Sequence, residues 1–178
     1  MYHSILVGHN LTFDVLFTYA NVPGCDLEKL TAAAPYDTWH KAFVARQQRG
    51  SLGLERIAYR YVPDMAGYEE EMTLLIARHP ELLHPDQGGH YANCPKDKWS
   101  THLQPYVMGD VEVAYQANKR IEKKLCDSKQ YSIPLADPDN PGQFRWYQAP
   151  HRKWVYDNIV SPASQTLMRM MGRGLQVD

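Results

Sequence analysis

The sequence is poor in cysteine and has no long apolar run. Its three cysteines, Cys25, Cys94 and Cys126, are odd in number and widely spaced, which argues against a disulfide framework and indicates a reducing compartment. No apolar run approaches the roughly 20 residues that a membrane-spanning helix needs. The first residues also lack the basic and then apolar layout of a signal peptide. We therefore expect a cytoplasmic protein that does not contact a membrane.

The chain also lacks an excess of charge of either sign, because its formal net charge is -1. A uniform positive field that attracts nucleic acid is therefore excluded, and any such contact must be local. With 44% hydrophobic and 22% charged residues, the composition is that of a folded globular protein. Basic residues do gather within one expected helix, where such a run is typical of a solvated face: Lys119, Arg120, Lys123 and Lys124.

Several signatures of enzyme families are missing. The sequence has no Walker loop, no dinucleotide fingerprint and no nucleophile elbow. Histidine and cysteine, the usual ligands of zinc, do occur in the irregular stretch 79–97. Their spacing fits no standard zinc module, so we interpret them as incidental loop residues: His79, His84, His90 and Cys94.

What the sequence does contain is mostly helical periodicity. A short apolar run over 3–8 predicts a buried strand, and apolar residues at helical spacing predict a helix over 12–22. Asp26 is positioned to cap a further short helix. Segments rich in turn residues predict loops over 79–97 and 127–150. The remaining expected elements are a strand over 34–38 and helices over 39–48, 52–61, 68–78, 99–125 and 151–172, the last kinked or split at Pro162.

The first candidate site lies where the first strand meets the first helix. The sequence GHNLTFD places Asn10 before this helix and Asp14 on its first turn. The end of a buried strand is a favoured position for an active site. The alternative is structural, with Asn10 capping the helix and Asp14 favouring its positive end.

The second candidate site is the pair Tyr106 and Asp110 in YVMGD. Residues four apart on a helix share one face, with Cβ atoms about 5–6 Å apart, so a phenol and a carboxylate would project together. Gly109 between them would allow a close approach by another backbone or a ligand. The alternative is an incidental surface pair.

In this order the two patterns resemble motifs of a known family, the DEDDy-type 3′→5′ exonuclease domain of family A DNA polymerases, especially those of bacteriophages. VGHNLTFD is similar to the second motif of the family, in which an aromatic residue, here Phe13, precedes the acidic one. YVMGDVEVAY is similar to the third motif. The intervening segment YDTWHKAFVARQQRGSLGLERIAYRYV and the tail YDNIVSPASQTLMRMMGRGLQVD are similar to two connecting helices and to the linking helix of that family.

The resemblance implies an α/β chain with an incomplete, helix-rich RNase H-like exonuclease fold that lacks the first strands of its sheet. Residues 1–126 would form the carboxyl-terminal part of the exonuclease domain. Residues 127–150 would form an irregular linker, and 151–178 a helix leading to the boundary of the polymerase domain.

The chemistry that the resemblance implies is phosphodiester hydrolysis with two divalent cations, Mg²⁺ or Mn²⁺. Asp14 would help to hold one cation and Asp110 the other, and the Tyr106 hydroxyl would orient the attacking water. Asn10 and Phe13 would contact the nucleotide at the 3′ end of a single-stranded DNA primer.

One motif of the family is absent. Its Asp-x-Glu motif lies upstream of the second motif, but only nine residues precede Asn10 and none of them is acidic. We therefore expect little exonuclease activity from this chain alone, and a partner chain that supplies the missing carboxylates beside a DNA polymerase subunit or domain. A split polymerase gene, which we favour, a truncation or an inactive remnant would each explain the gap.

The rival function is a catalytically inactive, exonuclease-like structural or DNA-binding subunit of a replication complex. If the chain is encoded by a phage, it would act in the cytoplasm of the bacterial host. The four tryptophans are expected to be core or interface anchors. Aromatic residues at the end of the second irregular segment would dock on the polymerase subunit or on the missing part: Phe144, Trp146 and Tyr147.

Overall fold

Helices dominate the structure, and the strands form two small sheets. The computed structural model describes residues 5–46, 52–68, 70–78, 96–128 and 131–174. In these ranges the strands pair two by two, so the expectation of a helix-rich chain with a small sheet component is confirmed. The chain forms two compact units, one from residues 1–52 and 118–178 and the other from residues 53–117.

The first unit contains two strands that each lead into a helix. β1 (Val7–Gly8) pairs in parallel with β2 (Tyr36–Asp37). The helices that follow them are α1 (Leu11–Asn21) and α3 (Thr38–Arg46). Among the described residues β1 has no other strand beside it, and the preceding Ile5 and Leu6 are 58% and 38% exposed. Within the described residues 5–8, the expected strand therefore covers only Val7 and Gly8 and is less buried than the apolar run suggested.

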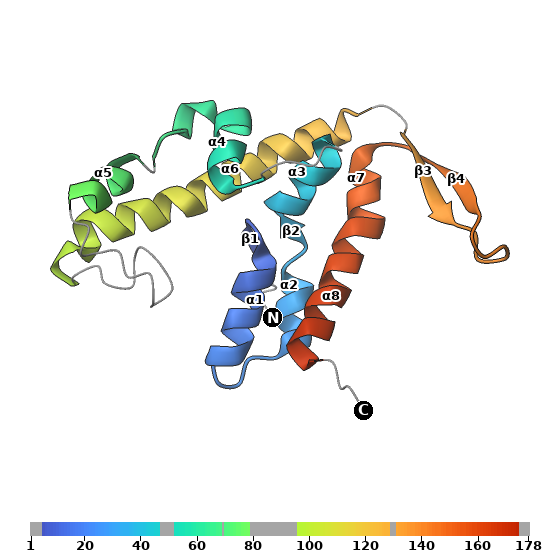
Figure 1. The fold of residues 1–178 in the computed structure, drawn as a ribbon, viewed down its shortest axis with the longest axis horizontal. Coiled ribbons are helices and arrows are strands. Elements are labelled where there is room, and N and C mark those ends of the chain that lie inside the picture. The colour runs from blue at the N-terminus through green and yellow to red at the C-terminus, as the bar shows by residue number, and fades with distance from the viewer. Residues whose placement is uncertain (1–4, 47–51, 69, 79–95, 129–130, 175–178) are drawn as a thin grey trace. The chain divides into compact units, whose positions relative to one another are not determined.

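Three helices of the first unit lie side by side, namely α1, α2 (Leu27–Ala33) and α8 (Ser161–Arg173) (Figure 1). A Cβ atom on Gly172 of α8 would lie 2.6 Å from the Leu27 side chain, so glycine lets α8 approach α2 closely. The Asp26 carboxylate accepts hydrogen bonds from the first backbone N–H groups of α2, which confirms the expected cap. The buried residues of this cluster come from all three helices and the end of α2: Leu11, Val15, Leu27, Ala34 and Met168.

The C-terminal segment is fastened to the parallel strands by a buried tyrosine. It consists of α7 (Arg152–Val155), the π-helical turn η6 (Tyr156–Val160) and α8, which begins one residue before Pro162. The Tyr156 hydroxyl donates to the Pro35 carbonyl at 2.6 Å and accepts from the Asp37 backbone N–H at 3.0 Å. Burial raises the pKa of Tyr156 well above its usual value, so the phenol stays protonated. Residues from 1–126 and 151–178, predicted as separate parts, thus contribute to the same unit.

The segment 127–150 is not irregular throughout, so that secondary-structure prediction is wrong. β3 (Tyr131–Ala136) and β4 (Phe144–Ala149) form an antiparallel hairpin. Although Pro134 lies within β3, most of the turn residues lie in the connection between these strands. There the Asp137 carboxylate accepts hydrogen bonds from the Asp139 backbone N–H and the Asn140 side chain, both at 3.0 Å. The turn therefore has its own polar anchor, and the apolar alternation around it belongs to strands.

The aromatic residues of this hairpin occupy both of its faces. Tyr147 stacks on Trp154 of α7 with ring centroids 4.9 Å apart. Phe144 and Trp146 are 66% and 69% exposed, and Trp39 and Trp99 are also exposed. Trp39, Trp99 and Trp146 are therefore not core residues of the described chain. The expected docking of the hairpin aromatics on a partner stays a prediction.

The second unit is helical in its described parts. The helices predicted over 52–61, 68–78 and 99–125 are confirmed, although π-helical residues open the last one. Residues 79–95, which include His79, His84, His90 and Cys94, lie outside the described ranges. None of the helices described is long and apolar enough to cross a membrane. The elements are α4 (Leu54–Tyr61), η1 (Pro63–Met65), α5 (Glu70–Arg78), η4 (Lys96–Lys98), η5 (Trp99–Leu103) and α6 (Gln104–Cys126), which continues into the first unit.

A fully buried lysine connects α3 to the C-terminal half of α6. The Lys41 ammonium group forms an ion pair with Glu122 and donates to the Asn118 side chain at 2.8 Å. Its Nζ atom also lies 4.3 Å from the centre of the Tyr36 ring. Burial lowers the pKa of Lys41, and the adjacent Glu122 carboxylate opposes this effect. Lys153 approaches the same carboxylate at 3.1 Å from α7.

Removing the carboxylate of Glu122 should destabilise the fold far more than removing its second cation. In Glu122→Gln the buried ammonium group of Lys41 loses its counter-charge, which we expect to lower the free energy of unfolding by about 3 kcal/mol. Lys153→Gln leaves Lys41 paired and should cost less than about 1 kcal/mol. Urea unfolding of both variants measures the difference, and equal losses would show that this ion pair contributes no special stability.

Candidate functional site

The carboxylate of Asp37 organises the corner that carries the first candidate site. This side chain is almost fully buried at the end of β2, with 2% of the residue exposed. One oxygen accepts from the backbone N–H groups of Asn10 and Trp39 at 3.0 and 2.8 Å. The other accepts from the Leu11 N–H at 3.0 Å and lies 3.2 Å from His40 Nδ1. Asp37 thus accepts hydrogen bonds from backbone N–H groups that have no partner within the helix, at the starts of both α1 and α3.

These hydrogen bonds keep Asp37 ionised. Burial alone would raise the pKa of the Asp37 carboxyl, but the contact with His40 and the backbone N–H donors outweigh burial and hold the pKa below its usual range. A buried negative charge therefore sits at neutral pH between the two parallel strands and the two helices that follow them.

Asn10 does not cap α1 with its side chain. Its backbone adopts the left-handed conformation, with φ 56° and ψ 49°, and its side chain makes no capping hydrogen bond. It is the one residue other than glycine with a positive φ in the described ranges. The capping role considered for Asn10 belongs to Asp37, so helix capping does not account for the Asn10 amide. Unusual backbone conformations of this kind concentrate at functional sites.

Asp14 lies on the first turn of α1 with its carboxylate at the surface. Partial burial raises the pKa of Asp14, and the negative charge of Asp37 adds to the increase. A hydrogen bond from the backbone N–H of Asp14 itself acts in the opposite direction and lowers the pKa, as expected at the start of a helix. The neighbouring Phe13 is 66% exposed and stacks on Phe17, with ring centroids 5.8 Å apart.

The second candidate pair is held by a tyrosine from the segment between α4 and α5. The Tyr68 hydroxyl donates a hydrogen bond to the Asp110 carboxylate, and the Tyr68 ring stacks on Tyr106 with centroids 6.1 Å apart. Both side chains therefore lie on the side of α6 that faces Tyr68, which confirms their predicted common face. A Cβ atom on Gly109 would lie 2.5 Å from the Tyr68 ring. The neighbour at Gly109 is thus a side-chain ring, and not the backbone or ligand that the sequence led us to expect.

The candidate residues fall into two groups. Asn10, Phe13 and Asp14 belong to the first unit, whereas Tyr106 and Asp110 belong to the second. Because Asp14 and Asp110 lie in different units, their convergence on shared metal ions stays a prediction. Across the ranges that the structure covers, no three His, Cys, Asp or Glu side chains lie close enough together to hold a metal ion.

Two residues that position the candidate side chains were not identified from the sequence. Asp37 had a detectable signal, because an acidic residue directly after a strand and before a helix is suited to bind backbone N–H groups. Tyr68 had none, since it is one of 12 tyrosines and lies 42 positions from Asp110.

Comparison of the chain with protein-family models, with curated proteins and with solved structures finds no match. The similarity to exonuclease motifs therefore rests on the residues already described, and its functional content is a proposal.

Replacing the Asp37 carboxylate should weaken the fold in a way that depends on pH. Because the pKa of Asp37 is lowered, the carboxylate adds stability above about pH 4, and this contribution is lost as the pH falls towards the lowered pKa. Asp37→Asn should therefore lose about 2 kcal/mol at pH 7. The difference from the original protein should shrink below about pH 4.

Urea unfolding at neutral and acid pH tests this, with Asp97→Asn as the control because Asp97 is exposed. The control should match the original protein at both pH values. If Asp37→Asn differed from the original protein by the same amount at both, the ionised state of Asp37 would not be the source of the stability.

Proposed function

We propose that this chain is a component of a DNA polymerase proofreading 3′→5′ exonuclease and requires a second chain for activity. The observation that carries the proposal is the corner at Asn10 and Asp14. There a surface carboxylate with a raised pKa follows a left-handed asparagine whose side chain the helix does not use. This geometry falls on the residues of the Asn-x-x-aromatic-Asp pattern.

The position of Asp14 is suited to bind a cation. Its carboxylate is exposed on the first turn of α1. Burial and the charge of Asp37 raise its pKa, and a bound divalent cation would favour the ionised form. Carboxylate oxygens are hard ligands that suit Mg²⁺ and Mn²⁺.

Asp110 would be the ligand from the second unit, with Tyr68 as its positioning residue. The hydrogen bond from Tyr68 fixes one carboxylate oxygen, which leaves the other for a cation. Tyr106 lies one helical turn before Asp110 and stacks on the same ring, so its hydroxyl would lie near the metal site and could orient water. When bound, the cations would supply a hydroxide nucleophile and stabilise the leaving oxygen.

A partner chain would complete the site and the sheet. Two carboxylates cannot neutralise two divalent cations, so further ligands are needed. β1 has one paired edge in the described chain, and the exposed Ile5 and Leu6 precede it. An added strand with Asp-x-Glu would cover this edge and extend the fold towards an RNase H-like sheet.

The test is digestion of single-stranded DNA in Mg²⁺ by the chain together with its Asp-x-Glu partner. The complex should remove nucleotides from the 3′ end, whereas the chain alone should not. Asp14→Ala and Asp110→Ala should each lower the rate by about 100-fold or more, since each removes a group that stabilises charge in the transition state.

Asp127→Ala is the matched control, because Asp127 is an exposed carboxylate directly after α6. It should leave the rate unchanged. Digestion that survives both Asp14→Ala and Asp110→Ala would reject the site. A stable complex that digests nothing would favour the inactive structural subunit instead.

A further inference from the structure

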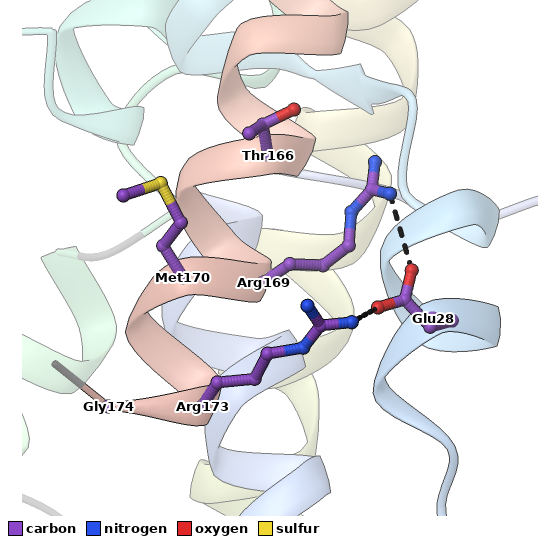
Figure 2. A pocket seen from close by; sticks show the side chains of 6 residues that line it. All are labelled: Glu28, Thr166, Arg169, Met170, Arg173 and Gly174. Atoms are coloured by element: carbon purple, nitrogen blue, oxygen red, sulfur yellow. Dashed lines mark hydrogen bonds and ion pairs between the residues drawn. The ribbon is translucent and has the colours of Figure 1, made fainter. Parts of the chain in front are cut away.

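A charged pocket lies between α2 and α8, away from the residues of the proposed exonuclease site. Its volume is about 370 Å³, which is within the usual range for small-ligand sites. Figure 2 shows two arginine side chains of α8 extending towards one glutamate of α2. The lining residues are Glu28, Thr166, Arg169, Met170, Arg173 and Gly174.

Both guanidinium groups are held in place by a single carboxylate. Arg169 Nη1 donates to one oxygen of Glu28 at 3.2 Å, and Arg173 forms an ion pair with the other oxygen. Arg169 Nε also donates to the Gln165 carbonyl at 3.2 Å. The two side chains are therefore oriented before any ligand arrives, which lowers the entropy cost of binding.

The pocket has donors and positive charge that Glu28 does not use. Each guanidinium group carries five N–H bonds in a planar fork. Within the described residues, the hydrogen bonds to Glu28 use one amino group of Arg169 and one of Arg173. Two positive groups face one negative group, so the three side chains together keep an excess positive charge.

Stability alone does not account for the second arginine. The side chains are 35% and 67% exposed for Arg169 and Arg173, and 48% for Glu28. Exposed ion pairs of this kind contribute about 0–1 kcal/mol. One arginine would be sufficient to pair Glu28 across the two helices.

The remaining lining residues of the pocket belong to α8 or directly follow it. Met170 is 51% exposed, and Figure 2 shows its side chain extending from the side of α8 away from the two guanidinium groups. Gly174 follows the last residue of α8 with φ 75°, a left-handed conformation that favours glycine.

We propose that the pocket lined by Arg169 and Arg173 binds a phosphate group. Paired guanidinium forks match the oxygens of phosphate, and the excess charge favours an anion. The same chemistry serves the backbone of a nucleic-acid strand and a free phosphate or nucleotide, and none of it involves Asp14 or Asp110.

In the first experiment the full chain is titrated with inorganic phosphate, and binding is monitored through the NMR signals of the arginine Nε–H groups. The signals of Arg169 and Arg173 should shift together with one affinity. Arg169→Gln and Arg173→Gln should each weaken binding by about tenfold or more, because each removes charge-assisted hydrogen bonds.

Arg56→Gln makes the same change on the exposed side of α4, outside the pocket lining, and should leave the affinity unchanged. Thermal unfolding followed by circular dichroism shows whether each variant is folded. The proposal is overturned if both folded pocket variants retain the original affinity within about twofold, or if acetate at equal ionic strength shifts the same signals as strongly as phosphate.

A second titration, with a short single-stranded oligonucleotide and with a mononucleotide, identifies the source of the phosphate. If the Arg169→Gln variant binds the oligonucleotide more weakly than the original protein does but binds the mononucleotide equally well, the pocket binds a nucleic-acid backbone. If the variant binds both probes more weakly, the pocket binds phosphate esters in general. If neither probe responds, the pocket does not bind phosphate esters. Because the phosphate titration measures Arg169 and Arg173 and no residue of the proposed exonuclease site, its result does not depend on whether the exonuclease proposal is correct.

Discussion

The buried carboxylate of Asp37 is the interaction on which the first unit depends. It accepts hydrogen bonds at the starts of two helices, and its own backbone N–H donates to the buried Tyr156 hydroxyl. One residue therefore connects β2, α1, α3 and the C-terminal segment. Because Asp37 carries a charge that burial opposes, the connection holds only while all its donors stay in place. The exposed position of Asp14 follows from this arrangement, since α1 begins where Asp37 fixes its first N–H groups.

The two groups of candidate residues are positioned in the same way. In each, a side chain from a neighbouring segment positions the residue that would do the chemistry: Asp37 fixes the helix of Asp14, and Tyr68 holds the carboxylate of Asp110. Glycine makes the second arrangement possible, because any Cβ at Gly109 would collide with the Tyr68 ring. Precise sites need such supporting contacts, since a ligand that is free to rotate binds a cation less effectively.

The helices were predictable from the sequence because their information is local. Apolar spacing, the cap at Asp26 and the position of Pro162 each act within a few residues, and the structure contains the elements that they indicate. The hairpin β3–β4 was missed, because proline and glycine in its turn obscured the alternation in its strands. The common face of Tyr106 and Asp110 followed from helical periodicity alone.

The residues that position the site were not predictable in the same way. The roles of Asp37, Tyr68 and Lys41 depend on partners that are far away in the sequence. Lys41 has the appearance of an ordinary surface charge on a helix, but it is fully buried against Glu122 and two tyrosine rings. Periodicity cannot identify a specific polar partner, because it reports which side of an element is buried and not what covers it.

The central claim is that Asp14 and Asp110 bind the same metal centre, and paramagnetic NMR tests it most directly. Mn²⁺ added to the chain in complex with its Asp-x-Glu partner should broaden the backbone signals around both aspartates over the same range of Mn²⁺ concentration. Asp14→Asn should weaken the broadening at both places together. Broadening around Asp110 that is unaffected by Asp14→Asn, or confined to one of the two segments, would contradict the shared site.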